Sequence, residues 1–489
     1  MTMICDPMPS LIPSEQTLKA LLQGSAYQSY SYAYPHKSAY RSFTPPVNLE
    51  TVWAEENRRA LFLYVHIPFC TMRCGFCNLF TLAQPQNSLV QQYLNQLEVQ
   101  MTMCAEYLGE HNFAQMAIGG GTPTFLTASQ LDGLFINIER TLSLRPGQVP
   151  STIEVSPETV DVEKLTVLRN AQFDRISMGV QSFVSDEIRS LARLQQNQVV
   201  GSAVDRIRSF GFRTLNLDLI YGISGQTMSS WKMSIDAALA YQPEEIYIYP
   251  LYVRPFTGLG KKRGDYQEIE LHQFDSQQAQ KGRSDSANST SPEALYLGAR
   301  QWLREAGYKQ VSMRMFRAPH VSSLTDGTAY SCQDDGMIGL GCGARSYTRK
   351  LHYSSEFAVS RGAVRQILLD YCERTRDTFS QAHHGFVLDS DEQSRRFVIQ
   401  SLLTEPGLDL IEYANRFGQD AFTNIPALRE LVDLGMATLR QSESMGDASN
   451  VHGVNLLSLT EAGVARSDTI GPWLISPSVK TRMESFDLS

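Results

Sequence analysis

The sequence holds few cysteines, no long apolar run and no excess of basic residues. Eight cysteines among 489 residues are too few for a scaffold held together by disulfides. No segment approaches about 18 consecutive apolar residues, so we expect no transmembrane helix, and the first residues lack the basic and apolar regions of a secretory signal. The formal net charge of −8 argues against a general binder of nucleic acid. We therefore expect a cytoplasmic enzyme of several domains.

Apolar runs of strand length alternate with helical stretches in the first half of the chain. Six of these runs are almost continuously apolar, as in strands that are buried on both faces. They cover residues 61–67, 114–121, 151–157, 173–180, 213–222 and 244–252. This order predicts an α/β fold with a partial (β/α)6 barrel of the TIM type, whose functional side chains lie at the carboxyl ends of the strands.

Shifts in composition divide the chain into five segments. The first is an arm rich in Ser, Tyr and Pro, which should lie on the main domain or close over an active site. A polar stretch after the barrel predicts a loop or disordered insertion, and the last segment has the helix–helix–ribbon order of a small α+β winged-helix-like module. We assign the arm to residues 1–60, the barrel to 61–260, the insertion to 261–292, a barrel extension on the substrate side to 293–385 and the module to 386–489.

The second helix of this module carries no basic surface, because Glu430 and Asp433 fall within it. A helix that reads DNA needs basic and polar side chains toward the phosphates and bases. We therefore favour a structural or substrate-covering role for the module over nucleic-acid binding.

Three cysteines directly follow the first predicted strand, in the spacing Cys-x3-Cys-x2-Cys. Pro68 ends that strand, so Cys70, Cys74 and Cys77 should lie on a loop at its carboxyl end. Such a loop can wrap three thiolates around one iron–sulfur cluster and leave one iron open, which is typical of a catalytic metal site. The alternatives are chance spacing and a structural zinc site, for which His66 in the strand is the nearest fourth ligand.

A glycine run, Gly119–Thr124 with the sequence GGGTPT, follows the second predicted strand. Glycines allow the backbone to approach a ligand closely, although a run of this kind alone is more often a tight turn. Its place one β/α unit after the cysteines favours a binding role.

The cysteine spacing, its flanking residues and the order of the barrel elements resemble the radical S-adenosylmethionine (SAM) superfamily. The resemblance implies a [4Fe-4S] cluster on Cys70, Cys74 and Cys77, with Phe76 as the aromatic residue before the last ligand. It also implies that an electron from a donor such as flavodoxin or ferredoxin cleaves SAM to methionine and a 5′-deoxyadenosyl radical. That radical abstracts a hydrogen atom from the substrate, while the protein positions the reactants.

A narrower resemblance is to the oxygen-independent coproporphyrinogen III oxidase family, including its heme-chaperone branch. The segments LYVHIPFC, GGGTPT, IEVSPE, RISMGVQSF and NLDLIYG carry it in order from about residue 60 to 255, and more weakly through IGLGCGARS into the C-terminal module. It implies porphyrin biosynthesis with a tetrapyrrole substrate. It further implies that a first SAM contacts Tyr64, Gly120 and Glu154, and that a second SAM position contacts Gly121, Thr122, Gln181, Arg193 and Asp218. Phe76 counts among the cofactor-binding residues as well.

Plain structural roles remain open for some of these residues. Glu154 and Asp218 on strands can be buried carboxylates in ion pairs. Gln181 and Arg193 can be polar groups at the rim of the barrel.

Three positions depart from the family pattern. Leu79 stands where the oxidase has a further cysteine, and Tyr252 stands where it has a small residue facing the second SAM. The segment Thr328–Cys332 has neither the His-Asn pair nor the Trp of the heme-chaperone motif. An oxidase, a heme or tetrapyrrole carrier, and a radical methylase or cyclopropanase therefore all remain open.

A few further residues are candidates for substrate contacts. Cys332, beside Asp334 and Asp335, could donate a hydrogen atom or bind substrate, although such a cysteine is more often a small buried residue. Arg345 and Arg349 could bind substrate carboxylates in bidentate fashion, although surface arginines are commoner. Cys342 in GLGCGA should serve packing.

Overall fold

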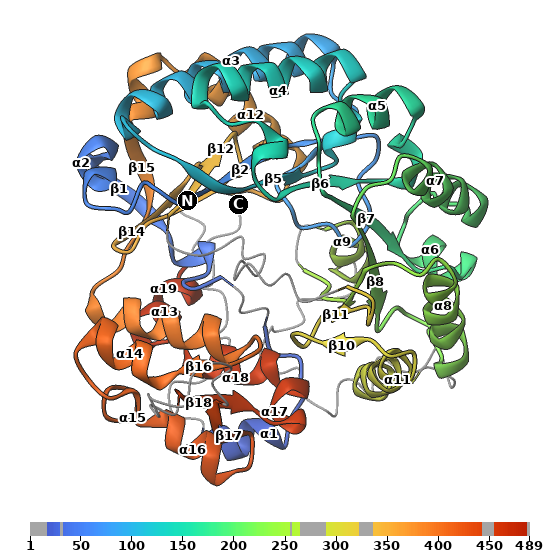
Figure 1. Ribbon diagram of the computed structural model, residues 1–489, viewed down its shortest axis with the longest axis vertical. Coiled ribbons are helices and arrows are strands. Elements are labelled where there is room, and N and C mark those ends of the chain that lie inside the picture. The colour runs from blue at the N-terminus through green and yellow to red at the C-terminus, as the bar shows by residue number, and fades with distance from the viewer. Residues whose placement is uncertain are drawn as a thin grey trace, which may run out of the picture.

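The computed structural model describes residues 17–29, 33–254, 257–264, 290–321, 336–442 and 454–486. A large sheet runs through its upper half (Figure 1). Its strands, in order, are β1 (Arg41–Asn48), β15 (Gln381–Val387), β14 (Leu351–Ser354), β13 (Arg345–Tyr347), β12 (Met337–Leu340), β2 (Leu61–Ile67), β5 (Phe113–Gly120), β6 (Ser151–Val155), β7 (Arg175–Gln181), β8 (Thr214–Tyr221), β9 (Glu245–Pro250), β11 (Met315–Arg317) and β10 (Lys309–Gln310).

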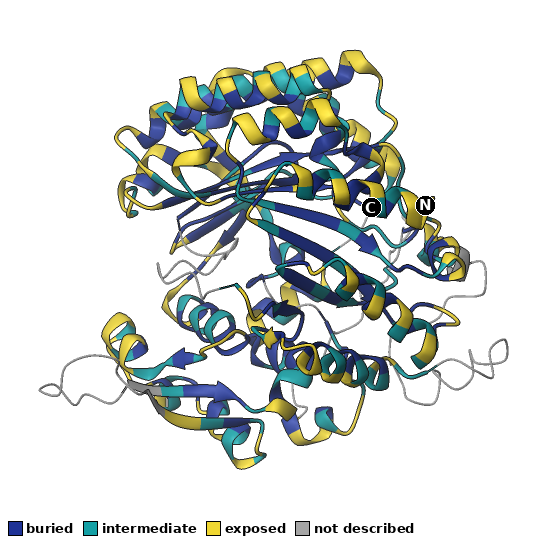
Figure 2. Cartoon of the chain, turned by 45° about the vertical axis from the view of Figure 1, so that its right-hand side comes forward, coloured by how far each residue is buried: buried dark blue, intermediate teal, exposed yellow. Residues whose placement is uncertain are grey.

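The six predicted apolar runs form the parallel centre of this sheet. Strands β2, β5, β6, β7, β8 and β9 pair in parallel with their sequence neighbours. Helices cover the outer face of the sheet, because the apolar side chains on that face must be shielded from water. They are α3 (Asn87–Leu108), α4 (Ala128–Leu142), α5 (Val162–Asn170), α6 (Ser185–Ser190), α7 (Asn197–Ser209), α8 (Met228–Ala240) and α11 (Pro292–Glu305) (Figure 1). Figure 2 shows exposed residues on the outer sides of the helices and mostly buried residues along the strands. The predicted α/β partial barrel is confirmed.

Helix boundaries follow from local side-chain chemistry. Thr127 and Gln130 form a reciprocal capping box at the start of α4. Ser291 accepts the Ala294 N–H at the start of α11, and Pro292 occupies the first turn. The polar stretch predicted as an insertion begins within α9 (Gly258–Gly264), and most of it lies outside the described residues.

The sheet continues beyond β2 into segments from both ends of the chain. Strand β12 is parallel to β2, and β13, β14, β15 and β1 then follow as antiparallel neighbours. Helix α12 (Arg361–Glu373) connects β14 to β15, and α2 (Leu49–Ala54) follows β1. The N-terminal arm therefore contributes a strand to the sheet, in addition to lying on the main domain.

The residues after 386 have a second core. Helix α13 (Ser390–Leu402) leads into α14 (Leu410–Phe417), α15 (Ala421–Asn424) and α16 (Ala427–Asp433), beside a sheet of β16 (Leu408–Asp409), β18 (Val454–Leu459) and β17 (Ala437–Ser442). Helices α17 (Glu461–Ala465), α18 (Ser467–Leu474) and α19 (Pro477–Glu484) end the described chain. This core also takes in Leu18 of α1 (Leu18–Leu22), Tyr34, Ala39 and Tyr40 from the arm.

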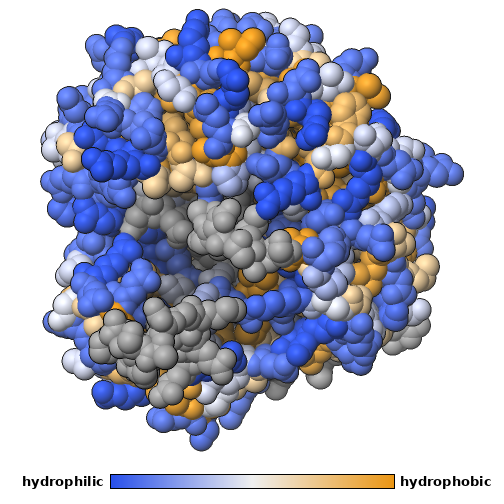
Figure 3. Space-filling model, viewed as in Figure 1, coloured by the Kyte–Doolittle hydropathy of each residue, from blue (hydrophilic) through white to orange (hydrophobic). Residues whose placement is uncertain are grey.

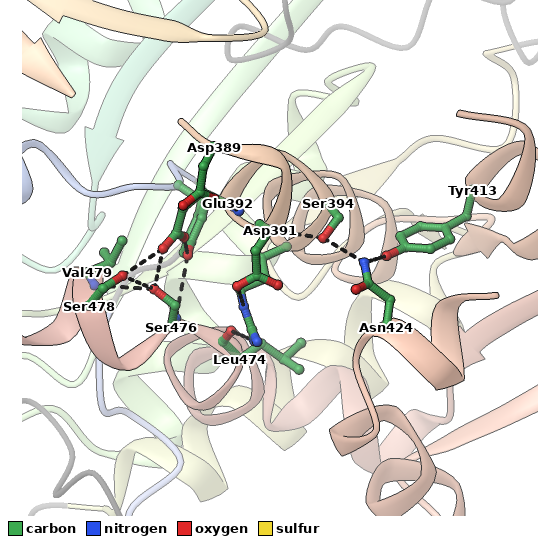
Figure 4. A network of polar contacts seen from close by, with 12 residues as sticks. Asp389, Asp391, Glu392, Ser394, Tyr413, Asn424, Leu474, Ser476, Ser478 and Val479 are labelled. Carbon is green, nitrogen blue, oxygen red and sulfur yellow. Dashed lines mark hydrogen bonds and ion pairs between the residues drawn. The ribbon is translucent and has the colours of Figure 1, made fainter. Parts of the chain in front are cut away.

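A buried carboxylate joins the arm to this C-terminal part. Glu392 on α13 accepts hydrogen bonds from Ser476 Oγ at 2.6 Å and Ser478 Oγ at 2.8 Å (Figure 4). It also accepts one from the Tyr34 hydroxyl of the arm. Because a buried carboxylate needs several donors, these contacts fix the arm against α13 and α19. Within the described parts of the chain, no helix is long and apolar enough to cross a membrane.

Candidate functional site

The cysteine loop leaves the carboxyl end of β2, as predicted. Two short parallel strands, β3 (Phe69–Cys70) and β4 (Leu82–Ala83), close its base, and Gln84 N donates to Cys70 O at 2.9 Å. Cys70 is buried, whereas Cys74 and Cys77 are half-buried. Each thiol has its own polar neighbour, since Cys70 Sγ lies 3.6 Å from Thr122 Oγ1 and Cys77 Sγ lies 4.0 Å from Thr81 Oγ1.

The three thiols suit a cluster better than a single ion. Burial raises the pKa of Cys70 to about 12 and also raises the pKa of Cys77, so both need a bound metal to become thiolates. In the described ranges, no three Cys, His, Asp or Glu side chains converge closely enough to hold one metal ion. A four-iron cluster differs, because each thiolate binds its own iron.

Both ring nitrogens of His66 have polar neighbours other than a metal ion. Its Nε2 lies 3.0 Å from Phe80 O, and its Nδ1 lies 3.3 Å from the Tyr64 hydroxyl. Burial lowers the pKa of His66 to about 4, so the ring is neutral and orients Tyr64. These contacts argue against the zinc alternative.

The glycine run brings the end of β5 against both the cysteine loop and β6. Gly120 has a φ of +115° and its N–H donates to Glu154 Oε2 at 3.1 Å. A Cβ on Gly121 would lie 2.6 Å from Phe69 O and 2.9 Å from Cys70 Sγ. Glycine is needed here because the backbone approaches the cysteine loop too closely for a side chain.

Five side chains that face the inside of the barrel are less completely covered than their neighbours along each strand. These inward residues are Tyr64, Glu154, Asp218, Tyr247 and Tyr249. In a filled barrel such positions would be packed in layers. We call the inner side of the barrel onto which these five side chains face the chamber; Gly120 and Gly121 join it to the cysteine loop.

Two carboxylates in the chamber, those of Glu154 and Asp218, have raised pKa values. Burial, opposed by the Gly120 N–H and reinforced by Asp218, raises the pKa of Glu154 to about 7. Burial also raises the pKa of Asp218 to about 6, against a hydrogen bond from Asn216 Nδ2 at 2.8 Å. The positive charge of Arg175 opposes both increases in pKa, although Arg175 also pairs with Glu245 at 2.8 Å.

Arg193 connects β7 to the cysteine loop. Its Nη2 donates to Gly179 O at 2.7 Å, and its Nη1 donates to Cys74 Sγ at 3.5 Å. Gln181 lies nearby with a φ of 72° at the end of β7. Phe76 packs instead against an apolar group that includes Leu191, Ile220 and Ile223, while Gly75 N donates to Leu191 O at 2.8 Å.

The remaining residues singled out in the sequence differ in where they lie. Cys332, Asp334 and Asp335 lie outside the described residues. Cys342 is fully buried with its Sγ 3.7 Å from Ser355 Oγ, as packing requires. Arg349 pairs with Glu56 at the surface, whereas Arg345 lies on the inner face of β13.

Leu79 and Tyr252, which depart from the family pattern, lie in unlike surroundings. Leu79 is 48% exposed and contributes no polar group. Tyr252 donates to Asp468 Oδ2 at 2.6 Å, and Arg314 Nη2 donates to the same oxygen at 2.5 Å. Asp468 could not be recognised from the sequence, because it lies on α18, 216 positions after Tyr252.

Comparisons with known proteins find relatives that match most of this chain. Residues 64–238 match the sequence model of the radical SAM superfamily, which uses a [4Fe-4S] cluster and SAM. The heme chaperone HemW of Bacillus subtilis is 27% identical over 385 residues, or 78% of this chain and 93% of that protein. The oxygen-independent coproporphyrinogen III oxidase of Escherichia coli is 25% identical over 433 residues, or 83% of this chain and 89% of that enzyme.

A solved structure shares the fold. Coproporphyrinogen III oxidase (HemN) from Escherichia coli superposes with a TM-score of 0.70 at 22% identity, covering 97% of this chain and 100% of that one. The likeness extends beyond the barrel into the segments that precede and follow it.

Glu154 should make SAM binding depend on pH. Its carboxylate form, which would attract the ammonium group of SAM, is populated above the pKa of about 7 and is lost as the pH falls through that value. We expect affinity for SAM to rise between pH 6 and pH 8 in the cluster-loaded protein. Glu154→Gln should lower the affinity about tenfold at pH 8 and remove the pH dependence, as measured by isothermal titration.

The exposed Glu158 offers a matched control in the same segment. Glu158→Gln should retain both the affinity and its pH dependence. Equal SAM affinity of Glu154→Gln and the unaltered protein at pH 8 would contradict the role of this carboxylate.

Proposed function

From the premise that this chain carries a radical SAM domain at residues 64–238, we propose that it is a radical SAM enzyme acting on a tetrapyrrole, of the coproporphyrinogen III oxidase type. The observation that carries the proposal is the convergence of three groups on one end of the chamber. The Gly119–Gly121 backbone lies within contact distance of the cysteine loop at Gly121 and of Glu154 at Gly119 and Gly120. The names of the relatives support the tetrapyrrole substrate.

Each group has a defined task in this proposal. Cys70, Cys74 and Cys77 would hold three irons of the cluster, and Arg193 would offset the negative charge on Cys74. Tyr64, Gly120 and Glu154 would bind the first SAM, with Glu154 and the Gly120 backbone at its amino group, and Phe76 would contact the cofactor from its apolar group. Gly121, Thr122, Gln181, Arg193 and Asp218 would contact a second SAM where one binds. When bound, the cluster and SAM supply the radical that removes a substrate hydrogen atom.

The chain would also exclude water from the reaction. The arm (1–60), the segment 293–385 and the C-terminal module (386–489) would cover the substrate. The reducing electron would come from a small carrier such as flavodoxin or ferredoxin.

Anaerobic turnover of coproporphyrinogen III tests the proposal. A propionate group would lose a hydrogen atom to give 5′-deoxyadenosine, then lose CO2 and one electron to an external one-electron acceptor, which leaves a vinyl group. We expect divinyl product after oxidation to porphyrin, with 5′-deoxyadenosine and methionine formed in step with it. An intact cluster that yields no 5′-deoxyadenosine would rule the proposal out.

A carrier role has one specific observation in its favour. The alignment with the heme chaperone HemW covers 93% of that protein. Stoichiometric heme binding without consumption of SAM would support it. In the same assay, transfer of a labelled methyl group from SAM would identify a methylase or cyclopropanase instead.

A further inference from the structure

The guanidinium group of Arg193 reaches the cysteine loop from the end of β7. Its Nη1 donates to Cys74 Sγ at 3.5 Å. Its Nη2 donates to Gly179 O at 2.7 Å, and its Nε donates to Gln195 Oε1 at 2.9 Å. Because these contacts use all three nitrogen atoms of one rigid, planar group, they fix both its position and its direction. The side of the guanidinium that carries Nη1 therefore points at a cysteine of the proposed cluster.

Gln195, which orients Arg193, is itself held by the backbone at the end of β7. Its Nε2 donates to Val180 O at 2.9 Å and to Ser182 O at 3.2 Å. The amide group can therefore present its oxygen to Arg193 only in the orientation observed. The guanidinium is thus supported by a rigid strand end rather than by a surface loop.

The turn before Arg193 packs against the middle of the cysteine loop. Gly75, which follows Cys74, donates its N–H to Leu191 O at 2.8 Å. A Cβ on Gly75 would lie 3.0 Å from that carbonyl oxygen and 3.1 Å from the Cβ of Ala192. The positions of Arg193 and Cys74 are therefore linked through the backbone as well as through their side chains.

A second arginine lies within the cysteine loop. Arg73 Nη2 donates to Cys77 O at 3.3 Å, and its Nε is buried with no hydrogen-bond partner in the described part of the chain. Burial raises the pKa of Cys77, and the positive charge of Arg73 opposes that rise. Burial likewise raises the pKa of Cys70 to about 12, and the positive charge of Arg193 opposes it. Both arginines thus favour negative charge on the sulfur atoms of this loop.

No carboxylate neutralises these two arginines. Within the residues that the structure describes, neither forms an ion pair, whereas Arg189, four residues before Arg193, pairs with Asp186 at the surface. Figure 3 shows a molecular face made up largely of hydrophilic residues, where water and salt screen exposed charges. Arg73 and Arg193 are half-buried, so their charges act on the loop with less screening.

The proposed reaction begins with one electron that an external donor delivers to the cluster site. This electron adds one negative charge next to the three thiolates. Hydrogen bonds to the sulfur atoms and nearby positive charge stabilise the reduced form more than the oxidised form, and so raise the reduction potential. Arg193 supplies both effects, whereas Arg73 supplies the second.

We propose that the guanidinium groups of Arg193 and Arg73 raise the reduction potential of the cluster, Arg193 through its hydrogen bond to Cys74 Sγ and Arg73 through its charge. Both are positioning residues in this role, since they act through the thiolates. The inference rests on the proposed function only in that the loop holds a cluster. Three of the five N–H groups of Arg193 are used in the contacts described, which leaves two for a second SAM.

A redox titration of the full-length, cluster-loaded protein without SAM tests this role. The protein is titrated anaerobically with titanium(III) citrate and viologen mediators, and the reduced cluster is measured by absorbance and by EPR. At the midpoint potential of the unaltered protein, Arg193→Gln should hold about tenfold less reduced than oxidised cluster, a shift of about 59 mV to lower potential for one electron. Arg193→Lys keeps the charge without the planar group and should lose less.

Other arginine variants provide the comparison. Arg73→Gln should lower the ratio of reduced to oxidised cluster about threefold, and the double variant with Arg193→Gln should lower it more than either change alone. Arg189→Gln removes an exposed arginine from the helix that precedes Arg193 and should leave the potential unchanged. An equal shift in Arg189→Gln would mean that the total charge of the protein sets the potential, and would overturn the proposal.

Iron content separates this role from a structural one. Loss of bound iron in Arg193→Gln and Arg193→Lys alike would show that the residue only holds the loop in place, and would overturn the proposal. An unchanged potential in Arg193→Gln with a full cluster would also overturn it. If Arg193→Gln alone loses its iron, Gln195→Leu, which removes the contact to Nε, takes its place, and an unchanged potential in that variant would overturn the proposal.

The outcome is distinguishable from that of the proposed reaction. SAM is absent from the titration, so contacts of Arg193 with a second SAM cannot produce the shift. A lowered potential in Arg193→Gln, in a protein that does not turn over coproporphyrinogen III, would keep this role and reject the reaction. Turnover by the unaltered protein, with one potential shared by all variants, would keep the reaction and reject this role.

Discussion

Cys74→Ala should leave the protein without an iron–sulfur cluster and reduce SAM cleavage to background. A [4Fe-4S] cluster held by three thiolates has no spare protein ligand, so loss of one thiolate leaves two irons open. Cys74 is half-buried, so the fold itself should be little affected. Iron and sulfide content, the visible absorbance of the cluster and the yield of 5′-deoxyadenosine under strong reductant measure the effect.

Cys372→Ser provides a matched control for this experiment. Cys372 is likewise half-buried, but it lies on α12 with no other cysteine of the proposed cluster beside it. It should retain its iron content and SAM cleavage. Retention of both by Cys74→Ala would show that the cluster is not held by this loop.

Asp468→Ala should cause the largest loss of stability among single changes considered for this chain. The Asp468 carboxylate is 1% exposed and accepts from Arg314 at 2.5 Å and from Tyr252 at 2.6 Å. Its removal leaves a buried guanidinium without its partner, which costs about 3–5 kcal/mol. Because a chain of this size need not unfold in one step, the test is the melting transition and protease sensitivity of the C-terminal part.

Two further variants serve as controls for this measurement of stability. Asp391→Ala removes the more exposed partner of Arg395 and should cost about 1 kcal/mol or less. Replacing both members of the buried pair, as Arg314→Met with Asp468→Leu, should restore most of the stability. A cost of about 1 kcal/mol or less for Asp468→Ala would mean that water reaches the pair.

The parts of the fold that could be predicted from the sequence are those with a local signal. The six central strands were recognisable because each is an unbroken apolar run. The cysteine loop and the glycine run were recognisable because their spacing is set within a few residues. Strands β12, β13 and β14 were missed, since three or four residues are too few to show a period.

The parts of the site that could not be predicted depend on tertiary contacts. Arg345 and Arg349 are both arginines in the same stretch, yet one faces the inside of the barrel and the other pairs with Glu56 at the surface. The direction of β13 decides this, and that direction depends on pairing with β12. The role of Tyr34 could not be recognised either, because its hydrogen-bond partner Glu392 lies 358 positions later.

The contact between Tyr34 and Glu392 has a consequence for the order of events during synthesis. The two residues are 358 positions apart, and at about 5–20 residues per second the ribosome needs roughly 20–70 s to make the chain between them. The barrel strands emerge within this interval, while the arm still lacks the core in which it packs. We therefore expect a nascent protein whose barrel folds with the chamber open, which leaves time for iron and sulfide to reach the cysteine loop before the chain ends close over it.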